Sequence, residues 1–282
     1  MKGDDPRLKP QYRMPRVFGA LPGPRNVPKD RQHLLNRQRN LALSMTMLTD
    51  RDALVELLPP GCVLDGEPLL TLNALYMTNI GWLAGRGYAL ISAGFRIARD
   101  SPSQGRLTGN FLAVVWENMA DPILTGREEL GWAKLFAEIP DPIAIDTDHV
   151  GSAGWDGFRF LDFSIRECRE TDPSPATASG SFHYKYVPET GALDRADVEY
   201  LEYSPPGAFA TGYGGMTVRQ RFTGRGDFVF HPARWEDIPF QYPIINALAA
   251  LPRLEMREAS VTISEADGKI GDPGGGALRK VT

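Results

Sequence analysis

Residues 117–134 read ENMADPILTGREELGWAK, and the rest of the chain can be placed around this stretch. An apolar strand pattern leads into it, and Asp121-Pro122 predicts a turn directly afterwards. Gly126-Arg127-Glu128 follows the turn, and Lys134 comes seven residues after Arg127. Residues three, four and seven apart line up on a helix, so a short helix here would place Arg127 and Lys134 on one face.

Lys134 stands in an apolar part of the sequence, with Leu130, Trp132, Leu135 and Phe136 close by. An amine among apolar side chains loses the hydration of its charged form, which lowers its pKa. A neutral amine is a nucleophile toward ketones. The spacing by itself favours a plainer interpretation, because a lysine after an amphipathic turn is more often a solvated surface charge. The local sequence leaves both interpretations open.

Composition narrows the class of protein. The chain has 282 residues, of which 42% are hydrophobic, enough for a sizeable core in one or two domains. The net charge of −4 favours neither a nucleic-acid partner nor a membrane surface. No apolar run approaches 18 residues, and the first residues lack the apolar region of a secretion signal. Cys62 and Cys168 are too few for a disulfide framework, so we expect a reduced, cytoplasmic protein.

Three segments differ in composition. Residues 1–40 form a Pro- and Arg-rich N-terminal arm, for which the fixed φ of proline predicts irregular structure. We expect this arm to lie over the globular part or over a neighbouring subunit. Residues 41–264 carry the periodic patterns of a folded domain, and residues 265–282, with three consecutive glycines, are expected to be a flexible tail.

Strand patterns dominate the domain. Thr49 is a candidate N-cap for a short helix, since Asp52 follows three residues later and prolines end the apolar stripe. A second helix is predicted at 244–251. Alternating or continuous apolar runs predict strands at 69–77, 88–97, 107–116, 158–169, 181–187, 198–203, 217–222, 228–230 and 254–263. This spacing predicts one α+β domain, mainly antiparallel β, with a curved, barrel-like sheet and a few short helices.

The order of several motifs resembles the acetoacetate decarboxylase family. The motifs are Thr49-Asp50-Arg51-Asp52-Ala53-Leu54, Leu57-Leu58-Pro59, Glu67-Pro68-Leu69, Asn118 with Gly126-Arg127-Glu128, Lys185-Tyr186-Val187-Pro188, and Leu251-Pro252. They span about three quarters of the chain and leave out the arm and the tail.

The resemblance implies that Lys134 is the amine that forms an imine, or Schiff base, with the substrate. Acetoacetate decarboxylase is itself the standard example of such an activated lysine. Arg127 and Glu128 would then be the other catalytic residues, orienting the lysine and binding a substrate oxygen; the alternative is an ion pair that only fixes the loop. The family uses no cofactor, acts on small-molecule oxo acids or ketones, and forms homo-oligomers. The four histidines show no metal-ligand spacing, so no metal is expected.

Departures from the decarboxylase pattern bear on the substrate. The decarboxylases carry a second lysine where this chain has Leu135, and by spacing their two pocket glutamates fall on Asn73 and Gly85. Arg86 adjoins the second of these positions. A pocket with an arginine and without the glutamates would favour an oxo acid other than acetoacetate. Arg86 would pair with the substrate carboxylate, unless Gly85-Arg86-Gly87 is simply a tight surface turn.

Five residues are therefore the candidates for substrate binding: Arg86, Asn73, Tyr76, Trp82 and Trp116. For the three aromatic residues, packing in the core is the competing interpretation. The sequence predicts a Schiff-base lyase of the decarboxylase type. An aldolase-dehydratase or another enzyme of secondary metabolism on the same fold remains an alternative, as does a non-catalytic small-molecule binding protein.

Overall fold

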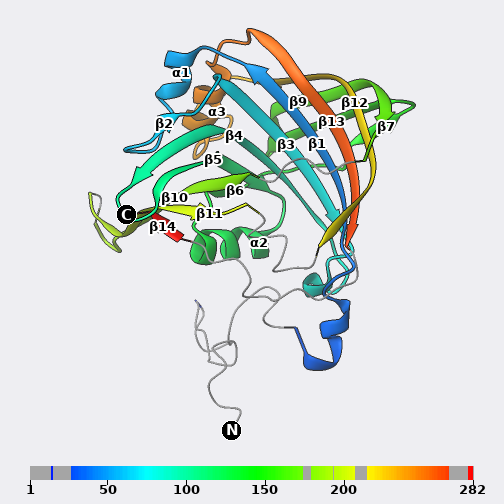
Figure 1. Cartoon of the computed structure of the whole chain (residues 1–282), viewed down its shortest axis with the longest axis horizontal. Helices are drawn as coiled ribbons and strands as arrows, with labels where there is room; N and C mark the ends of the chain where they lie inside the picture. Colours follow the sequence, from blue (N-terminus) through cyan, green and yellow to red (C-terminus); the bar gives the residue numbers. More distant parts are fainter. Residues whose placement is uncertain are drawn as a thin grey trace.

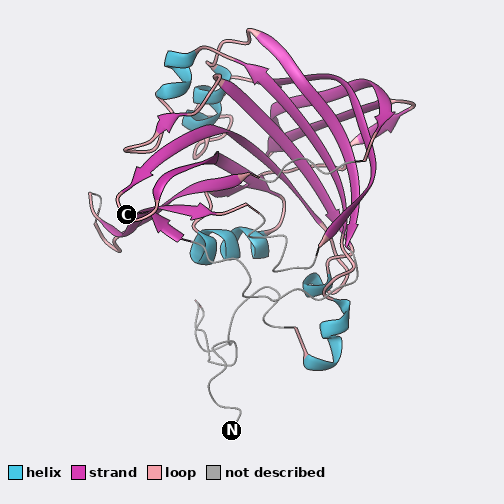
Figure 2. Cartoon of the chain, in the orientation of Figure 1, coloured by secondary structure: helices cyan, strands magenta, loops and turns pink. Residues whose placement is uncertain are grey.

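The computed structural model describes residues 14, 27–173, 179–192, 194–206, 215–266 and 279–281. Strands make up most of this part of the chain, with a few short helices at the edges (Figure 2). The strands are β1 (Arg39–Leu48), β2 (Val63–Leu64), β3 (Leu69–Thr78), β4 (Tyr88–Ser101), β5 (Gly105–Glu117), β6 (Lys134–Phe136), β7 (Ile143–Ile145), β8 (Asp148–Trp155), β9 (Phe158–Thr171), β10 (Gly180–Pro188), β11 (Ala196–Ser204), β12 (Met216–Phe230), β13 (Glu255–Ala266) and β14 (Arg279–Val281).

The helical segments are short. They are the 3-10 helices η4 (Lys29–Leu34) and η5 (Gly81–Leu83), the α-helices α1 (Arg51–Val55), α2 (Ala120–Thr125) and α3 (Tyr242–Ala249), and the π-helical turn η6 (Gly126–Leu130). Asp50, not Thr49, caps α1, because its carboxylate accepts a hydrogen bond from the backbone N–H of Ala53 at 2.9 Å. Thr49 is instead buried just before the helix.

One curved sheet contains all fourteen strands of the described residues, in the order β14-β11-β10-β5-β4-β3-β1-β13-β12-β9-β8-β7, with β2 on β4 and β6 on β5 (Figure 1). Most neighbours are antiparallel. The two exceptions lie on the edge of β5 that faces away from β4. There β10 pairs in parallel with residues 109–111, and β6 pairs in parallel with residues 115–117. The expected α+β fold with a curved, mainly antiparallel sheet is confirmed.

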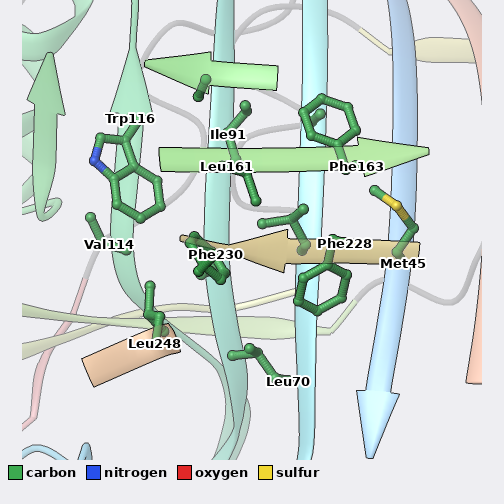
Figure 3. Close-up of a cluster of buried hydrophobic side chains, with 14 of the residues drawn as sticks. Met45, Leu70, Ile91, Val114, Trp116, Leu161, Phe163, Phe228, Phe230 and Leu248 are labelled. Atoms are coloured by element: carbon green, nitrogen blue, oxygen red, sulfur yellow. The ribbon is translucent and has the colours of Figure 1, made fainter. Parts of the chain in front are cut away.

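The hydrophobic core lies where the sheet folds over itself. Figure 3 shows β9 and β12 crossing β1, β3, β4 and β5, with side chains from both groups of strands meeting between them. Leu161, Phe163 and Phe228 meet Met45 and Ile91 in this layer, and all five are at most 2% exposed. Burial of this apolar area is the main stabilising term.

The register of the strands gives the sheet two distinct faces. Ala74, Ile91 and Trp116 are paired across β3, β4 and β5, so they share the core face. The opposite face carries a row that runs across five strands: Ser44, Asn73, Ser92, Val115 and Lys134. Successive side chains on a strand alternate between the two faces, so Glu117 lies on the face of Lys134.

Most of the predicted strands are confirmed, with longer bounds. Residues 217–222 and 228–230 belong to one strand, β12, since the glycines between them stay extended. Strands β1 and β8 were not predicted, because their mixtures of apolar and small polar residues are weaker strand patterns. Parts of the expected tail form strands: β13 extends to Ala266, and Leu201 of β11 pairs with Val281 of β14.

Lys134 is not on a helix with Arg127, which corrects the expectation from spacing. Helix α2 and turn η6 end at Leu130, because Gly131 adopts a left-handed φ of 76° that reverses the chain. Lys134 then opens the short strand β6, beside Val115 of β5. Its side chain is therefore directed by sheet register instead of helical periodicity.

Candidate active site

Lys134 is a buried amine held by three neighbours. Its side chain is 5% exposed, and Nζ lies 2.7 Å from Oε1 of Glu117, whose side chain is fully buried. Nζ also donates a hydrogen bond to the carbonyl oxygen of Pro122 in α2 at 3.0 Å. The same atom lies 4.9 Å from the ring centroid of Trp132, within the range of a cation–π contact.

Burial acts on both members of this pair. It lowers the pKa of Lys134, with the charge of Glu117 opposing the shift. It raises the pKa of Glu117, with Lys134 opposing. Desolvation penalises both charged forms, so it favours a neutral amine beside a protonated carboxyl, whereas their attraction favours the ion pair. The interpretation of Lys134 as a solvated surface charge is wrong.

The segment between β5 and β6 is shaped around the lysine. A Cβ at Gly126 would lie 2.3 Å from Cδ and 2.4 Å from Cε of Lys134, so only glycine lets the η6 backbone approach this closely. Arg127 is exposed, and its guanidinium donates to the backbone carbonyl of Lys134 at 3.0 Å. Arg127 thus contacts the lysine's backbone and not its amine. Glu128 is exposed, and its own carbonyl accepts a hydrogen bond from Lys185 of β10.

A second buried polar group adjoins the lysine through Trp132. The indole ring stacks on the imidazole of His183 in β10, with centroids 4.7 Å apart and an interplanar angle of 10°. Burial, reinforced by the charge of Lys134, lowers the pKa of His183 to about 3, so the ring is neutral. Nε2 lies 3.2 Å from Oγ of Ser181 and 3.9 Å from Oε2 of Glu202, the residue that pairs with His183 on β11.

Glu202 is buried with one oxygen satisfied. Ser204 donates to Oε1 at 3.0 Å, while Oε2 has no hydrogen-bond partner within the described ranges. Burial raises the pKa of Glu202 to about 7, with the Ser204 hydrogen bond opposing. Nδ1 of His183 likewise lacks a partner in the described part of the chain. These are buried polar groups with unused hydrogen-bonding capacity.

Asn73 is brought into register with Lys134. The two residues belong to the same row on the same face, three strands apart, which corresponds to about 14 Å along the sheet. Arg86 is exposed in the turn between β3 and β4, where its guanidinium donates to the carbonyl of Leu83 at 3.4 Å. This geometry favours the surface-turn interpretation of Arg86. Trp82 lies in η5 of the same connection and is half-buried.

Trp116 and Tyr76 do not join Lys134. Trp116 is fully buried on the core face, against Phe160, and its indole N–H donates to Gln241 at 2.7 Å. Tyr76 shares that face and is 6% exposed. Their expected role as substrate-binding residues beside the lysine is therefore corrected, because strand alternation points both side chains to the other side of the sheet.

A model of the acetoacetate decarboxylase (ADC) family matches residues 20–257. The chain belongs to the acetoacetate decarboxylase family. The match covers the lysine segment and strands β1 to β12, and it ends at the start of β13. A comparison with curated proteins gives no match.

Solved structures of family members share this fold. An acetoacetate decarboxylase has a TM-score of 0.63 and 13% identity, covering 86% of this chain and 89% of that one. The enzyme from Legionella pneumophila has a TM-score of 0.61 and 18% identity, covering 87% and 86%. The enduracididine biosynthesis enzyme MppR complexed with pyruvate has a TM-score of 0.59 and 18% identity, covering 86% and 89%. At these identities the likeness shows the fold alone.

Three buried residues near Lys134 were not predicted from the sequence: Glu117, His183 and Glu202. Glu117 ends an apolar run, which is a weak sign that a charged residue is paired. His183 and Glu202 sit in alternating strands with no motif around them. Within the described ranges, no group of three or more His, Cys, Asp or Glu side chains is arranged to hold a metal ion. The helices described are all too short or too polar to cross a membrane.

Proposed function

We propose that this family member is a carbon–carbon lyase that forms an imine between Lys134 and the ketone of a small oxo acid. The observation that carries the proposal is the buried amine, with Nζ 2.7 Å from a buried carboxylate on the same face of the sheet. Burial lowers the pKa of Lys134, which increases the neutral, nucleophilic form of the amine at physiological pH. No cofactor is needed, because the protonated imine is itself an electron sink.

In the proposed reaction, Lys134 adds to the ketone and water leaves, giving a protonated imine. A β-carboxylate then leaves as carbon dioxide, and its electron pair forms an enamine. Protonation of the enamine carbon and hydrolysis release the product and the lysine. Arg127 supports this role in two ways: it holds the backbone of Lys134, and its exposed guanidinium retains donors for a substrate carboxylate.

The substrate is expected to differ from acetoacetate. Asn73 lies in the row of Lys134 and is neutral. By sequence spacing it occupies the position at which the decarboxylases carry a pocket glutamate. Aldol condensation and dehydration through the same imine is the second candidate. MppR, which shares the fold, has been crystallised with the condensation product of pyruvate and imidazole 4-carboxaldehyde. Both reactions begin with the same imine.

Reductive trapping tests the shared step. The protein is treated with borohydride and a panel of oxo acids that includes pyruvate and acetoacetate, and the modified peptide is identified by mass spectrometry. We expect one adduct, on Lys134, that is lost in Lys134→Ala. Lys185→Arg is the matched control, because Lys185 contacts the same loop through the Glu128 carbonyl, and its labelling should equal that of the native protein. An adduct that persists in Lys134→Ala, or no adduct with any member of the panel, rejects the proposal.

Release of carbon dioxide from a β-oxo acid then separates decarboxylation from condensation, which consumes an aldehyde instead. Multiple turnovers with either substrate separate an enzyme from a binding protein.

A further inference from the structure

Glu117 has no assigned role, although it is the carboxylate closest to the candidate nucleophile. It is the last residue of β5, its side chain is fully buried, and it lies two positions beyond Val115, the register partner of Lys134. One oxygen contacts Nζ at 2.7 Å, and Oε2 has no hydrogen-bond partner in the described part of the chain. Burying a charge with an unsatisfied oxygen costs free energy. A carboxylate kept in this state is therefore a candidate for a functional role.

Other charged and polar groups around the amine come from several elements, but among the described residues none of these brings a proton acceptor to Nζ. His183 of β10 lies behind Trp132 and is neutral. Arg127 of η6 contacts the lysine's carbonyl and not Nζ. From α2, the contact is the backbone oxygen of Pro122, which can accept a hydrogen bond but cannot be protonated. Among the contacts that Nζ makes with residues the structure describes, only Glu117 can receive a proton.

The geometry allows the proton to occupy either partner. Nζ and Oε1 are 2.7 Å apart, which is within the usual range for a charge-assisted hydrogen bond. A proton can therefore pass between them without any movement of the backbone. Burial stabilises the neutral pair, and electrostatic attraction stabilises the ion pair, so the two opposing effects bring the two proton positions closer in free energy.

We propose that Glu117 is the proton-transfer partner of Lys134 during formation of the imine. This role rests on the imine chemistry proposed above. Glu117 first accepts the ammonium proton, which leaves a free amine and a carboxylic acid. The amine attacks the ketone carbon: a C–N bond forms, and the carbonyl π electrons move to oxygen. A proton moves from nitrogen to that oxygen and yields the neutral carbinolamine.

Glu117 then returns its proton to the carbinolamine hydroxyl. The C–O bond breaks, water leaves, and the nitrogen lone pair forms the C=N bond. The carboxylate is regenerated beside a positively charged imine, so the pair has the same net charge before and after the reaction. The sum is one ammonium group and one ketone giving one protonated imine and one water.

The test compares Glu117→Gln with Glu138→Gln, an exposed glutamate just beyond β6, as matched control. The rate of adduct formation with pyruvate and cyanoborohydride is measured across pH, and NMR of protein labelled at the lysine side chains follows the protonation of Lys134. Removing the negative charge should lower the pH midpoint of Lys134. Adduct formation should nevertheless slow by about 10²–10⁴ at every pH, the usual contribution of a proton-transfer residue. Glu138→Gln should match the native protein.

If Glu117 only balanced the positive charge of Lys134 and transferred no proton, the kinetic result would be the opposite. Glu117→Gln would then contain more free amine, and adduct formation would be faster. An unchanged or faster rate, or an unchanged midpoint of Lys134, overturns the proposal. If native protein forms no adduct with any oxo acid, the proposed function fails, which is a different result from a fast Glu117→Gln.

Should Glu117→Gln fail to fold, Glu117→Asp provides the second test. It retains the charge but withdraws the carboxylate by one methylene, and an error of that size in placement costs about 10² in rate. A native rate in Glu117→Asp also overturns the proposal.

Discussion

At the scale of single residues, the candidate site is built by close approach. Lys134 is confined between the carboxylate of Glu117, the carbonyl of Pro122 and the ring of Trp132. Each contact restricts a side chain with four rotatable bonds. The conformational entropy of the lysine is therefore lost on folding and not when substrate binds. Gly126 is the residue that leaves room for the side chain.

Replacing Gly126 with alanine should displace the lysine and leave the fold nearly intact. The added Cβ would contact the flexible outer part of Lys134, with Nζ at 2.8 Å, so the side chain can move while the backbone stays in place. We expect the rate of adduct formation with oxo acid to fall by about 10², since misplacement by about 1 Å has this effect.

The control for this experiment is Leu124→Ala, an exposed change on the neighbouring helix α2. Both variants should unfold within a few degrees of the native protein. Gly126→Ala with native adduct formation would show that the lysine tolerates the crowding.

At the scale of elements, the lysine owes its position to a change of structure. Helix α2 and turn η6 carry the chain across the end of β5, Gly131 reverses it, and β6 returns alongside β5 (Figure 1). Strand β6 has three residues, too few to be stable without its partners. The hydrogen bond from Arg127 to the Lys134 carbonyl ties η6 to the first residue of β6.

Arg127→Met should therefore reduce imine formation, and the dependence on substrate concentration shows how. If Arg127 only positions Lys134, the limiting rate falls and the half-saturating concentration of pyruvate is unchanged. If it also binds the carboxylate, the half-saturating concentration rises as well. Loss of a hydrogen bond to a charged donor costs about 1.5–3 kcal/mol, or roughly 10- to 100-fold in rate.

Arg86→Met is the matched control, since Arg86 is an exposed arginine that contacts the carbonyl of its own turn. It should behave as the native protein toward pyruvate. Native kinetics in Arg127→Met would remove Arg127 from the candidate site.

At the scale of the whole molecule, one sheet performs two tasks. Its core face packs against itself where β9 and β12 cross the central strands (Figure 3), while the other face carries polar residues under α2 and η6. The polar layer has a thermodynamic cost that depends on pH. Glu202, with a pKa raised to about 7 by burial, is protonated in the folded protein over a range where the unfolded chain would ionise it.

The raised pKa sets the direction in which folding stability changes with pH. Glu202 favours folding fully below about pH 4.5, and that contribution is lost as the pH rises through about 7. Glu202→Gln should thus be more stable than the native protein at pH 8, by up to about 3 kcal/mol, with the difference vanishing near pH 4.5. Urea denaturation at several pH values measures this directly.

The buried His183 has the opposite dependence, because its pKa is lowered, and it is present in both proteins. The exposed Glu170→Gln is the control and should match the native protein at each pH. A constant difference between Glu202→Gln and native protein would show that the carboxyl is ionised in the fold.

The sequence by itself determined the strand-rich fold and the segment that carries the lysine. Apolar alternation is a local property with the period of a strand, so β3, β4, β5 and β9 were predicted within a few residues. Lys134, Arg127 and Glu128 could be named as candidates because their motif is contiguous, and Asn73 because it follows Glu67-Pro68-Leu69 at a fixed spacing.

Only the tertiary structure decided which side chains meet the amine. Glu117 reaches Lys134 because β6 pairs in parallel with β5, and His183 joins through Trp132 because β10 occupies the same edge of β5. Strand register also places Trp116 in the core, whereas Arg86 lies in an exposed turn. The physical reason is that a shift of one residue in pairing reverses which face a side chain occupies, and pairing is set by contacts between segments far apart in the chain.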